Sequence, residues 1–136
     1  MTPEHLAQIH ADAFVHERSW QAAEFADLLA KPHIQCLTDA GGFALTQTIA
    51  DEAELLTLAV SPAHQRQGIA QKLMTRWIST SDANTAFLEV AADNTAAIAL
   101  YSKNGFTPSG LRKGYYKRPS GTPVDALLMM RPFTQG

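Results

Sequence analysis

Apolar residues recur at three- and four-residue steps in three stretches of the chain, a spacing that predicts helices with one buried face. Thr2 can cap the first stretch, and Pro3 suits a first helical turn. A further helix is predicted where Asn94 can act as a cap and Gly105 stands in the position of a left-handed C-terminal cap. The predicted helices cover residues 3–14, a short segment that ends before Pro32, residues 68–80 and residues 94–104.

The apolar runs between these helices predict β-strands. Gly41-Gly42 supplies the backbone freedom that a tight hairpin turn between two of them needs. Residues 53–60, AELLTLAV, are almost continuously apolar, which is typical of a strand buried on both faces. The predicted strands are residues 33–37, 42–49, 53–60, 85–91 and two more on either side of a Pro/Gly/Ser-rich loop at residues 119–123.

This order of elements predicts an α/β fold in which a mixed, mostly antiparallel sheet is flanked by helices. The strand at residues 53–60, the helix after it and the strand at residues 85–91 should form a central parallel, right-handed unit. A length of 136 residues suits a single domain, residues 1–136.

The composition excludes several classes of protein. A formal net charge of −2 gives no general attraction to nucleic acid or to an anionic membrane. No stretch approaches the roughly 20 apolar residues of a membrane span. The single cysteine, Cys36, agrees with a reducing compartment, and the five histidines lack metal-ligand spacing. We therefore expect a soluble cytoplasmic protein with no metal, no membrane partner and no direct nucleic-acid partner.

The turn QRQGIA, residues 65–70, links the predicted strand at residues 53–60 to a predicted helix. Unpaired N–H groups and the positive end of the helix dipole meet at such a turn, so an anion is favoured there. Gly68 lets the backbone approach a phosphate, Ala70 keeps the first turn uncrowded, and Arg66 adds a positive charge. An ordinary turn with a glycine explains the same six residues when they are taken alone.

The neighbouring segments resemble one family. The pattern Gln/Arg-x-x-Gly-x-Gly/Ala in residues 65–70 resembles the acetyl-CoA pyrophosphate loop of the GNAT superfamily of N-acetyltransferases. FLEVAADNTAAIALYSKNGF, residues 87–106, resembles that family's strand, Asn-capped helix and Tyr-x-x-x-Gly-Phe ending. RKGYY, residues 112–116, is similar to the branch that acetylates the N-terminal alanine of a bacterial ribosomal protein. The resemblance covers residues 53–130.

The resemblance implies acetyl-CoA as the co-substrate and direct transfer to a primary amine within a ternary complex. The residues it assigns to the coenzyme are Leu58, Ala59, Val60, Gln65, Arg66, Gln67, Gly68, Ile69, Ala70, Asn94 and Tyr101. The strand residues would use main-chain groups, which is compatible with side chains in the core. Asn94 would contact the pantetheine arm.

The resemblance also assigns catalytic roles. Glu89 matches the general base and Tyr101 the general acid that protonates the leaving thiolate. Glu89 interrupts an apolar strand, where a carboxylate is costly unless it is paired or faces a wet cleft. Glu54 is the second candidate base or a substrate contact. Tyr115 and Tyr116 match the substrate side, although an aromatic edge strand explains them equally well.

The implied acceptor is the N-terminal α-amino group, with alanine first, of a ribosomal or other protein. An α-amine has a pKa of about 7.7–8.0, against about 10.4 for lysine, so it is easier to present neutral. Thr57 stands where that branch often carries asparagine, so a small-molecule amine acetyltransferase stays open as an alternative. A non-catalytic acyl-CoA-binding regulator is a further alternative. Because the first helix begins at Pro3, we expect the family's first strand to be absent. We also expect a monomer or a weak homodimer.

Overall fold

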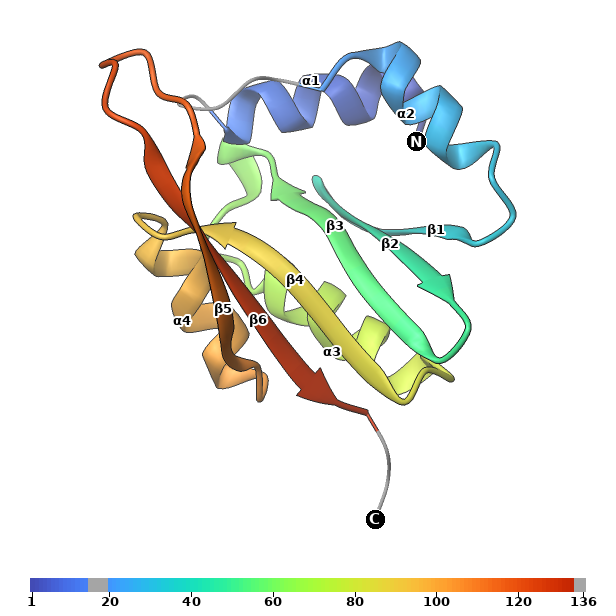
Figure 1. Cartoon of the computed structure of the whole chain (residues 1–136). Coiled ribbons are helices and arrows are strands. Elements are labelled where there is room, and N and C mark those ends of the chain that lie inside the picture. Colours follow the sequence, from blue (N-terminus) through green and yellow to red (C-terminus); the bar gives the residue numbers. More distant parts are fainter. Residues whose placement is uncertain (15–19, 134–136) are drawn as a thin grey trace.

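The computed structural model describes residues 1–14 and 20–133, which fold into a six-stranded sheet with helices on both faces (Figure 1). The helices are α1 (Pro3–Ala13), α2 (Ala22–Leu29), α3 (Ile69–Thr80) and α4 (Thr95–Lys103), and a short 3-10 turn, η1, covers Pro62–His64. The strands are β1 (Ile34–Asp39), β2 (Gly42–Ile49), β3 (Glu52–Val60), β4 (Thr85–Ala91), β5 (Thr107–Tyr116) and β6 (Val124–Pro132).

The strands lie in the order β1-β2-β3-β4-β6-β5. β3 and β4 are parallel, and the other neighbouring pairs are antiparallel. The predicted α/β class, the mixed sheet and the central parallel unit β3-α3-β4 are therefore confirmed. None of the four helices in the described residues is long and apolar enough to span a membrane.

The sheet separates two hydrophobic cores. Phe43 and Leu45 of β2 point to one face, where they pack with α1 and α2, whereas Ala44 between them points to the other face. There α3 buries Leu73 and Trp77. Full burial of each large apolar side chain contributes about 1.5–3 kcal/mol. The alternation along β2 therefore fixes which helices cover which face.

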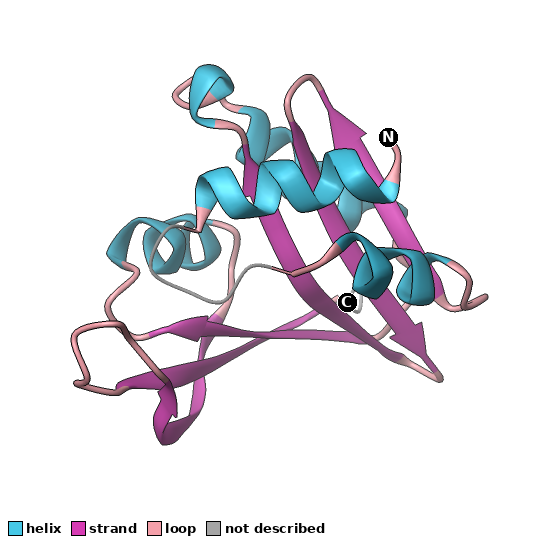
Figure 2. Cartoon of the chain, turned by 90° about the horizontal axis from the view of Figure 1, so that it is seen from above, coloured by secondary structure: helices cyan, strands magenta, loops and turns pink. Residues whose placement is uncertain are grey.

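β3 and β4 pair only over the first part of their length. Their last paired residues are Leu55 and Leu88, but β3 continues to Val60. A bulge at Leu56 bends β3 at this point, since Thr46 of β2 faces Leu55 and Leu45, the residue before it, faces Thr57. The two halves of the sheet diverge beyond the bulge (Figure 2).

This divergence corrects the expectation that residues 53–60 are buried on both faces. Ala53, Leu55 and Ala59 are buried. The other residues from 54 to 60 are only half-buried, because they line a cavity in place of packed side chains. The continuous apolar run thus lines a cavity as well as contributing to the core.

The hairpin between β1 and β2 is confirmed, but the reason for its glycines differs. The positive φ of the turn falls at Ala40, with φ 44°. Gly41 lies directly against the ring of His64, so a Cβ there would collide with it. A Cβ on Gly42 would lie 2.8 Å from Cγ2 of Ile69. Both glycines are required by close packing against the segment that follows β3.

The predicted N-terminal caps of α1 and α4 are both confirmed. Thr2 Oγ1 accepts a hydrogen bond of 3.1 Å from the N–H of His5, and α1 begins at Pro3 as expected. Asn94 Oδ1 accepts one of 3.2 Å from the N–H of Ala97, and Gly105 has φ 90°. In the described residues no strand precedes α1, and β1 forms that edge of the sheet.

Candidate active site

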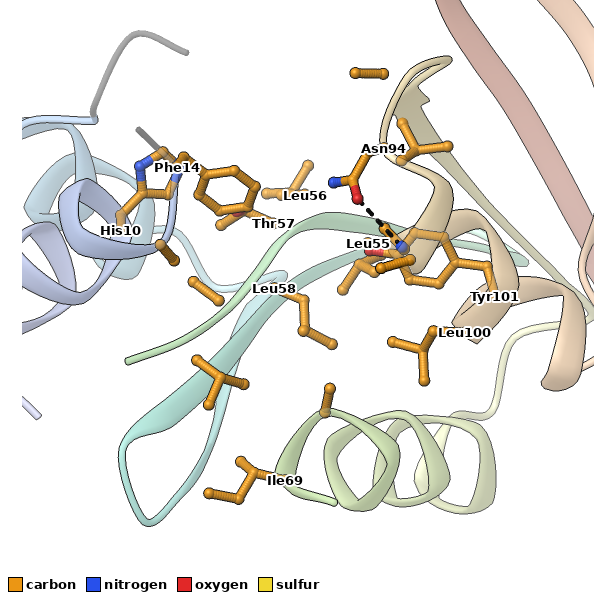
Figure 3. Close-up of a pocket in the computed structure, with 18 of the residues that line it drawn as sticks. His10, Phe14, Leu55, Leu56, Thr57, Leu58, Ile69, Asn94, Leu100 and Tyr101 are labelled. Carbon is orange, nitrogen blue, oxygen red and sulfur yellow. Dashed lines mark hydrogen bonds between the residues drawn. The ribbon is translucent and has the colours of Figure 1, made fainter. Parts of the chain in front are cut away.

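A cavity of about 730 Å³ opens where β3 and β4 diverge (Figure 3). Leu58 of β3 lies in its middle, with Ile69 at the start of α3 on one side. Asn94 and Tyr101 face it from α4, and Phe14 faces it from α1. The cavity is therefore built by the central strand and by helices from both faces of the sheet.

One end of the cavity is formed by the loop before α3. Gly68, with φ 74°, is the N-cap residue, and no side chain caps this helix, so its first N–H groups are open to a ligand. Arg66 also has a positive φ, of 65°, and lines the cavity. Gln65 Nε2 donates a hydrogen bond of 3.1 Å to the carbonyl of Val60, which fastens the loop to the end of β3. An anion is favoured at this end.

The loop residues differ in their exposure to the cavity. Gly68, Ile69 and Ala70 line it, and a Cβ built on Gly68 would enter open space. Gln67 is exposed and does not line the cavity. Gln71, which the sequence did not single out, does line it.

The middle of the cavity follows β3 after its pairing with β4 has ended. Leu58, Ala59 and Val60 all line this part, and they pair with β2 on their other edge. Their edge toward β4 is unpaired beyond Leu55, which leaves main-chain groups for an extended ligand. That these residues serve a coenzyme as well as the core stays a prediction.

Two carboxylates share one face of the sheet. Glu54 and Glu89 alternate with Leu55 and Leu88, which belong to the core under α3, so the glutamates point to the face that carries α1 and α2. Both line the cavity. Glu89 Oε1 lies 3.1 Å from Nη2 of Arg112, and its side chain is only 22% exposed. The ion pair fixes the position of the Glu89 carboxylate at the cavity wall.

The electrostatic environment of Glu54 is less favourable to charge. Burial raises the pKa of the Glu54 carboxyl, and the negative charge of Glu89 raises it further, while Arg112 acts in the opposite direction. Glu54 is therefore a carboxyl that takes up a proton more readily than an exposed glutamate does.

Tyr101 stands on the other side of the gap. It is 7% exposed, and its ring meets the ring of Phe106 edge-on at 6.3 Å. Burial raises the pKa of the Tyr101 hydroxyl well above its ordinary value, and the nearby Tyr116 adds to the effect. Tyr101 therefore keeps its proton at neutral pH. Tyr101 and Asn94 line the cavity together, as their seven-residue spacing predicts.

Sequence reasoning missed an aromatic group at the end of the cavity near α1. His10 is buried, and its Nδ1 accepts a hydrogen bond of 3.3 Å from the N–H of Trp20. The two rings stack at 5.3 Å, and Phe14 lies 4.6 Å from His10. All three line the cavity. His10 and Phe14 have an ordinary helical spacing of four residues, and Trp20 is a lone tryptophan outside α1, so no sequence signal distinguished the three.

The tyrosines of β5 complete this end. Tyr115 is 52% exposed and its ring lies 5.2 Å from that of Tyr116. Both line the cavity, so all three tyrosines of the chain belong to the cavity wall. Within residues 1–14 and 20–133 no three metal-ligating side chains cluster, and the absence of a metal requirement stays a prediction.

The arrangement can support acyl transfer. A loop suited to an anion lies at one end, unpaired main chain follows it, and two carboxylates and a protonated phenol line the same cavity. The Acetyltransferase (GNAT) family model matches residues 4–106. The chain belongs to the GNAT acetyltransferase family. The predicted class, an acetyl-CoA-dependent N-acetyltransferase, is thereby confirmed.

Similar proteins extend this finding over nearly the whole chain. The ribosomal protein bS18-alanine N-acetyltransferase of Escherichia coli K12 is 36% identical over 135 residues, which cover 94% of this chain and 90% of that protein. The N-alpha-acetyltransferase RimI of Mycobacterium tuberculosis is 36% identical over 134 residues, covering 92% and 83% of the two chains.

Solved structures share the architecture. The crystal structure of the E. coli ribosomal-protein-S18-alanine N-acetyltransferase superposes with a TM-score of 0.87 at 34% identity, covering 98% of this chain and 89% of that one. Arabidopsis thaliana NAA60 in complex with acetyl-CoA has a TM-score of 0.78 at 22% identity, covering 96% and 92%, and shows the common fold. The predicted resemblance is confirmed.

Proposed function

We propose that this chain, residues 1–136 acting as one catalytic domain, transfers the acetyl group of acetyl-CoA to the N-terminal α-amino group of a protein. The proposed first residue of the acceptor is alanine, and the proposed acceptor is a ribosomal protein. The observation that carries this proposal is 36% identity to a bS18-alanine N-acetyltransferase over 94% of the chain. Such an acceptor would be met in the cytoplasm, where we expect the protein to act as a monomer or weak homodimer without contacting nucleic acid directly.

The loop and central strand would hold the coenzyme. The open N–H groups at the start of α3, with Arg66 beside them, suit its pyrophosphate. Leu58, Ala59 and Val60 offer main-chain groups to its pantetheine arm. Gly68, Ile69 and Ala70 keep the approach clear of side-chain bulk, and Gln65 holds the loop in place. Gln67, which is exposed, would act through its main chain, and Asn94 would contact the arm beside Tyr101.

The acceptor amine would lose its proton to Glu89. An α-ammonium group has a pKa of about 7.7–8.0, so a modest base is sufficient. Arg112 orients the Glu89 carboxylate, whose side chain is 22% exposed, and a water molecule between Glu89 and the amine would pass the proton. Glu54 is the second candidate base, because its carboxyl protonates more readily. The neutral amine then forms the new C–N bond to the acetyl carbon.

The C–S bond breaks as the C–N bond forms, and the departing thiolate needs a proton donor. Tyr101 is buried, protonated and exposed only toward the cavity. A thiol has a pKa of about 8.5, below that of tyrosine, so the phenol stabilises the thiolate first as a hydrogen-bond donor. The proton that Tyr101 gives up is replaced from the amine by way of solvent.

The aromatic group His10, Phe14 and Trp20, together with Tyr115 and Tyr116, would surround the first residue of the acceptor. A small apolar side chain suits such a wall, because it leaves no polar group unpaired. The methyl group of alanine meets this requirement.

The experiment that tests the proposal is release of free CoA from acetyl-CoA by the purified protein. The acceptors are peptides that differ only in their first residue, spermidine and an aminoglycoside. Turnover is expected with the Ala-starting peptide. Turnover only with the small amines would replace the proposed acceptor, and binding of acetyl-CoA without any turnover would favour a regulator.

A further inference from the structure

β5 is interrupted just before it reaches the cavity. Arg112 pairs with Ala126 and Tyr116 pairs with Val124, so β5 has three residues where β6 has only Asp125. Gly114 lies in this bulge with φ 61°. Its N–H donates a hydrogen bond of 2.8 Å to Oδ1 of Asp125. The bulge is thus held by a side chain in place of the regular strand ladder.

A second attachment follows directly after the strand. Arg118 Nη2 lies 2.9 Å from Oδ1 of Asp93, and the guanidinium group stands 5.6 Å from the centre of the Tyr116 ring. The Arg118 side chain is only 10% exposed, whereas most surface arginines are fully hydrated. The Asp93 side chain is 55% exposed, so the pair joins a buried guanidinium group to a carboxylate at the surface.

Asp93 occupies a particular place in the fold. It belongs to the turn between β4 and α4 and immediately precedes Asn94, the N-cap of α4 and a wall residue of the cavity. The same turn is tied to β6, since the N–H of Ala92 donates to the carbonyl of Asp125 at 2.8 Å. The Arg118–Asp93 pair therefore connects the coenzyme side of the cavity to the end of β5.

The connected segment carries the two acceptor-side tyrosines. Tyr116 is packed under the Arg118 guanidinium and lies close enough to Tyr101 to influence its hydroxyl. Tyr115 precedes it at the end of the bulge. The pair adds a charged contact to the pairing of Tyr116 with Val124 and to the hydrogen bond between Gly114 and Asp125. Breaking the pair would give the two tyrosines more freedom of position relative to Tyr101.

We propose that Arg118 and Asp93 form a latch that positions Tyr115 and Tyr116 at the acceptor end of the cavity. Both are positioning residues, and neither contacts the reacting atoms. The latch controls acceptor binding while leaving the coenzyme loop unchanged. This inference rests on the proposed function, because it takes the β5 end of the cavity as the acceptor site.

The test compares Arg118→Met, Asp93→Asn and the double variant with the wild type. Each single variant is expected to raise the KM for the Ala-starting peptide about tenfold, the effect of losing one charge-assisted hydrogen bond. The Kd for acetyl-CoA should stay within about twofold, since the loop before α3 is untouched. The double variant should be no worse than either single one, because both remove the same interaction.

A purely structural role predicts a different pattern. Parallel losses of melting temperature, acetyl-CoA affinity and kcat in both single variants would overturn the proposal, as would additive effects on KM in the double variant.

A second readout separates the latch from the identity of the acceptor. Amide hydrogen exchange over residues 115–122 should accelerate in Arg118→Met and stay unchanged in the control Lys117→Met, which removes an exposed charge one residue away. If the wild type is inactive on every peptide, the proposed function fails. The exchange measurement still tests whether the Arg118–Asp93 pair fixes the end of β5. Unchanged exchange in Arg118→Met would refute it.

Discussion

Leu55 and Leu88 are the last residues at which β3 and β4 pair, and the cavity begins immediately beyond them. Glu89 follows Leu88 directly, so the candidate base stands at the edge of the gap. Tyr101 faces the same cavity from α4. The end of one strand pair thus lets groups on opposite faces of the sheet act on one substrate.

Replacement of Glu89 by Gln tests the base. Glu89→Gln keeps the size of the side chain but removes the proton acceptor, so kcat is expected to fall by about a hundredfold to ten-thousandfold. Steady-state kinetics with the Ala-starting peptide measures this, and calorimetry should show unchanged acetyl-CoA binding. The control Glu52→Gln changes an exposed glutamate on β3. Wild-type turnover in Glu89→Gln would assign the base elsewhere, with Glu54 the first candidate.

The pKa of Glu54 leads to a stability prediction. Because folding raises this pKa, the native state resists ionisation of the carboxyl. The penalty is absent below the ordinary value near 4.5 and grows as the pH rises above it. Glu54→Gln should therefore raise the melting temperature at pH 7 and have little effect at pH 4. A lower melting temperature at pH 7 would show that the charged Glu54 stabilises the fold.

Tyr101 makes a prediction about alkaline pH. Since burial raises the pKa of its hydroxyl above that of free tyrosine, Tyr101 stays protonated up to about pH 10. Tyr101→Phe should lower kcat at every pH without moving any alkaline limb of the pH–rate profile. The profiles of the two proteins, measured at saturating acetyl-CoA, check this. Loss of an alkaline limb in the variant would mean that Tyr101 ionises in the working range.

Two glycines that both have a positive φ allow backbone strain to be separated from ligand contact. Gly68 has φ 74° and Gly121 φ 87°, and a Cβ on either would meet nothing within 4 Å. Alanine at either position costs about 1–2 kcal/mol of folding stability. Only Gly68→Ala should also weaken acetyl-CoA binding, because its methyl group would enter the cavity. Equal Kd values for the two variants would remove Gly68 from the coenzyme site.

Local signals in the sequence predicted the elements proposed to hold the coenzyme. Asn94 and Gly105 bound α4 as expected, since a cap and a left-handed residue are decided by local chemistry. The turn before α3 was likewise predicted from Gly68. The bulges at Leu56 and Gly114 were not predicted, because each depends on the register of a partner strand.

Long-range packing explains the other omissions. His10 and Trp20 meet only after α1 and the segment before α2 have docked on the sheet. In the sequence, His10 is one position of a predicted helix and Trp20 is a lone tryptophan. The Arg118–Asp93 pair joins residues 25 positions apart, and no local pattern couples them. The acceptor end of the cavity is therefore the part that the sequence described least.

The most direct measurement is tandem mass spectrometry of a peptide that begins with alanine and carries one internal lysine, after incubation with the protein and acetyl-CoA. We expect a single acetyl group on the N-terminal α-amine. A matched peptide with a blocked N-terminus should stay unmodified. Acetylation of the lysine side chain in both peptides would contradict the proposed N-terminal acetyltransferase.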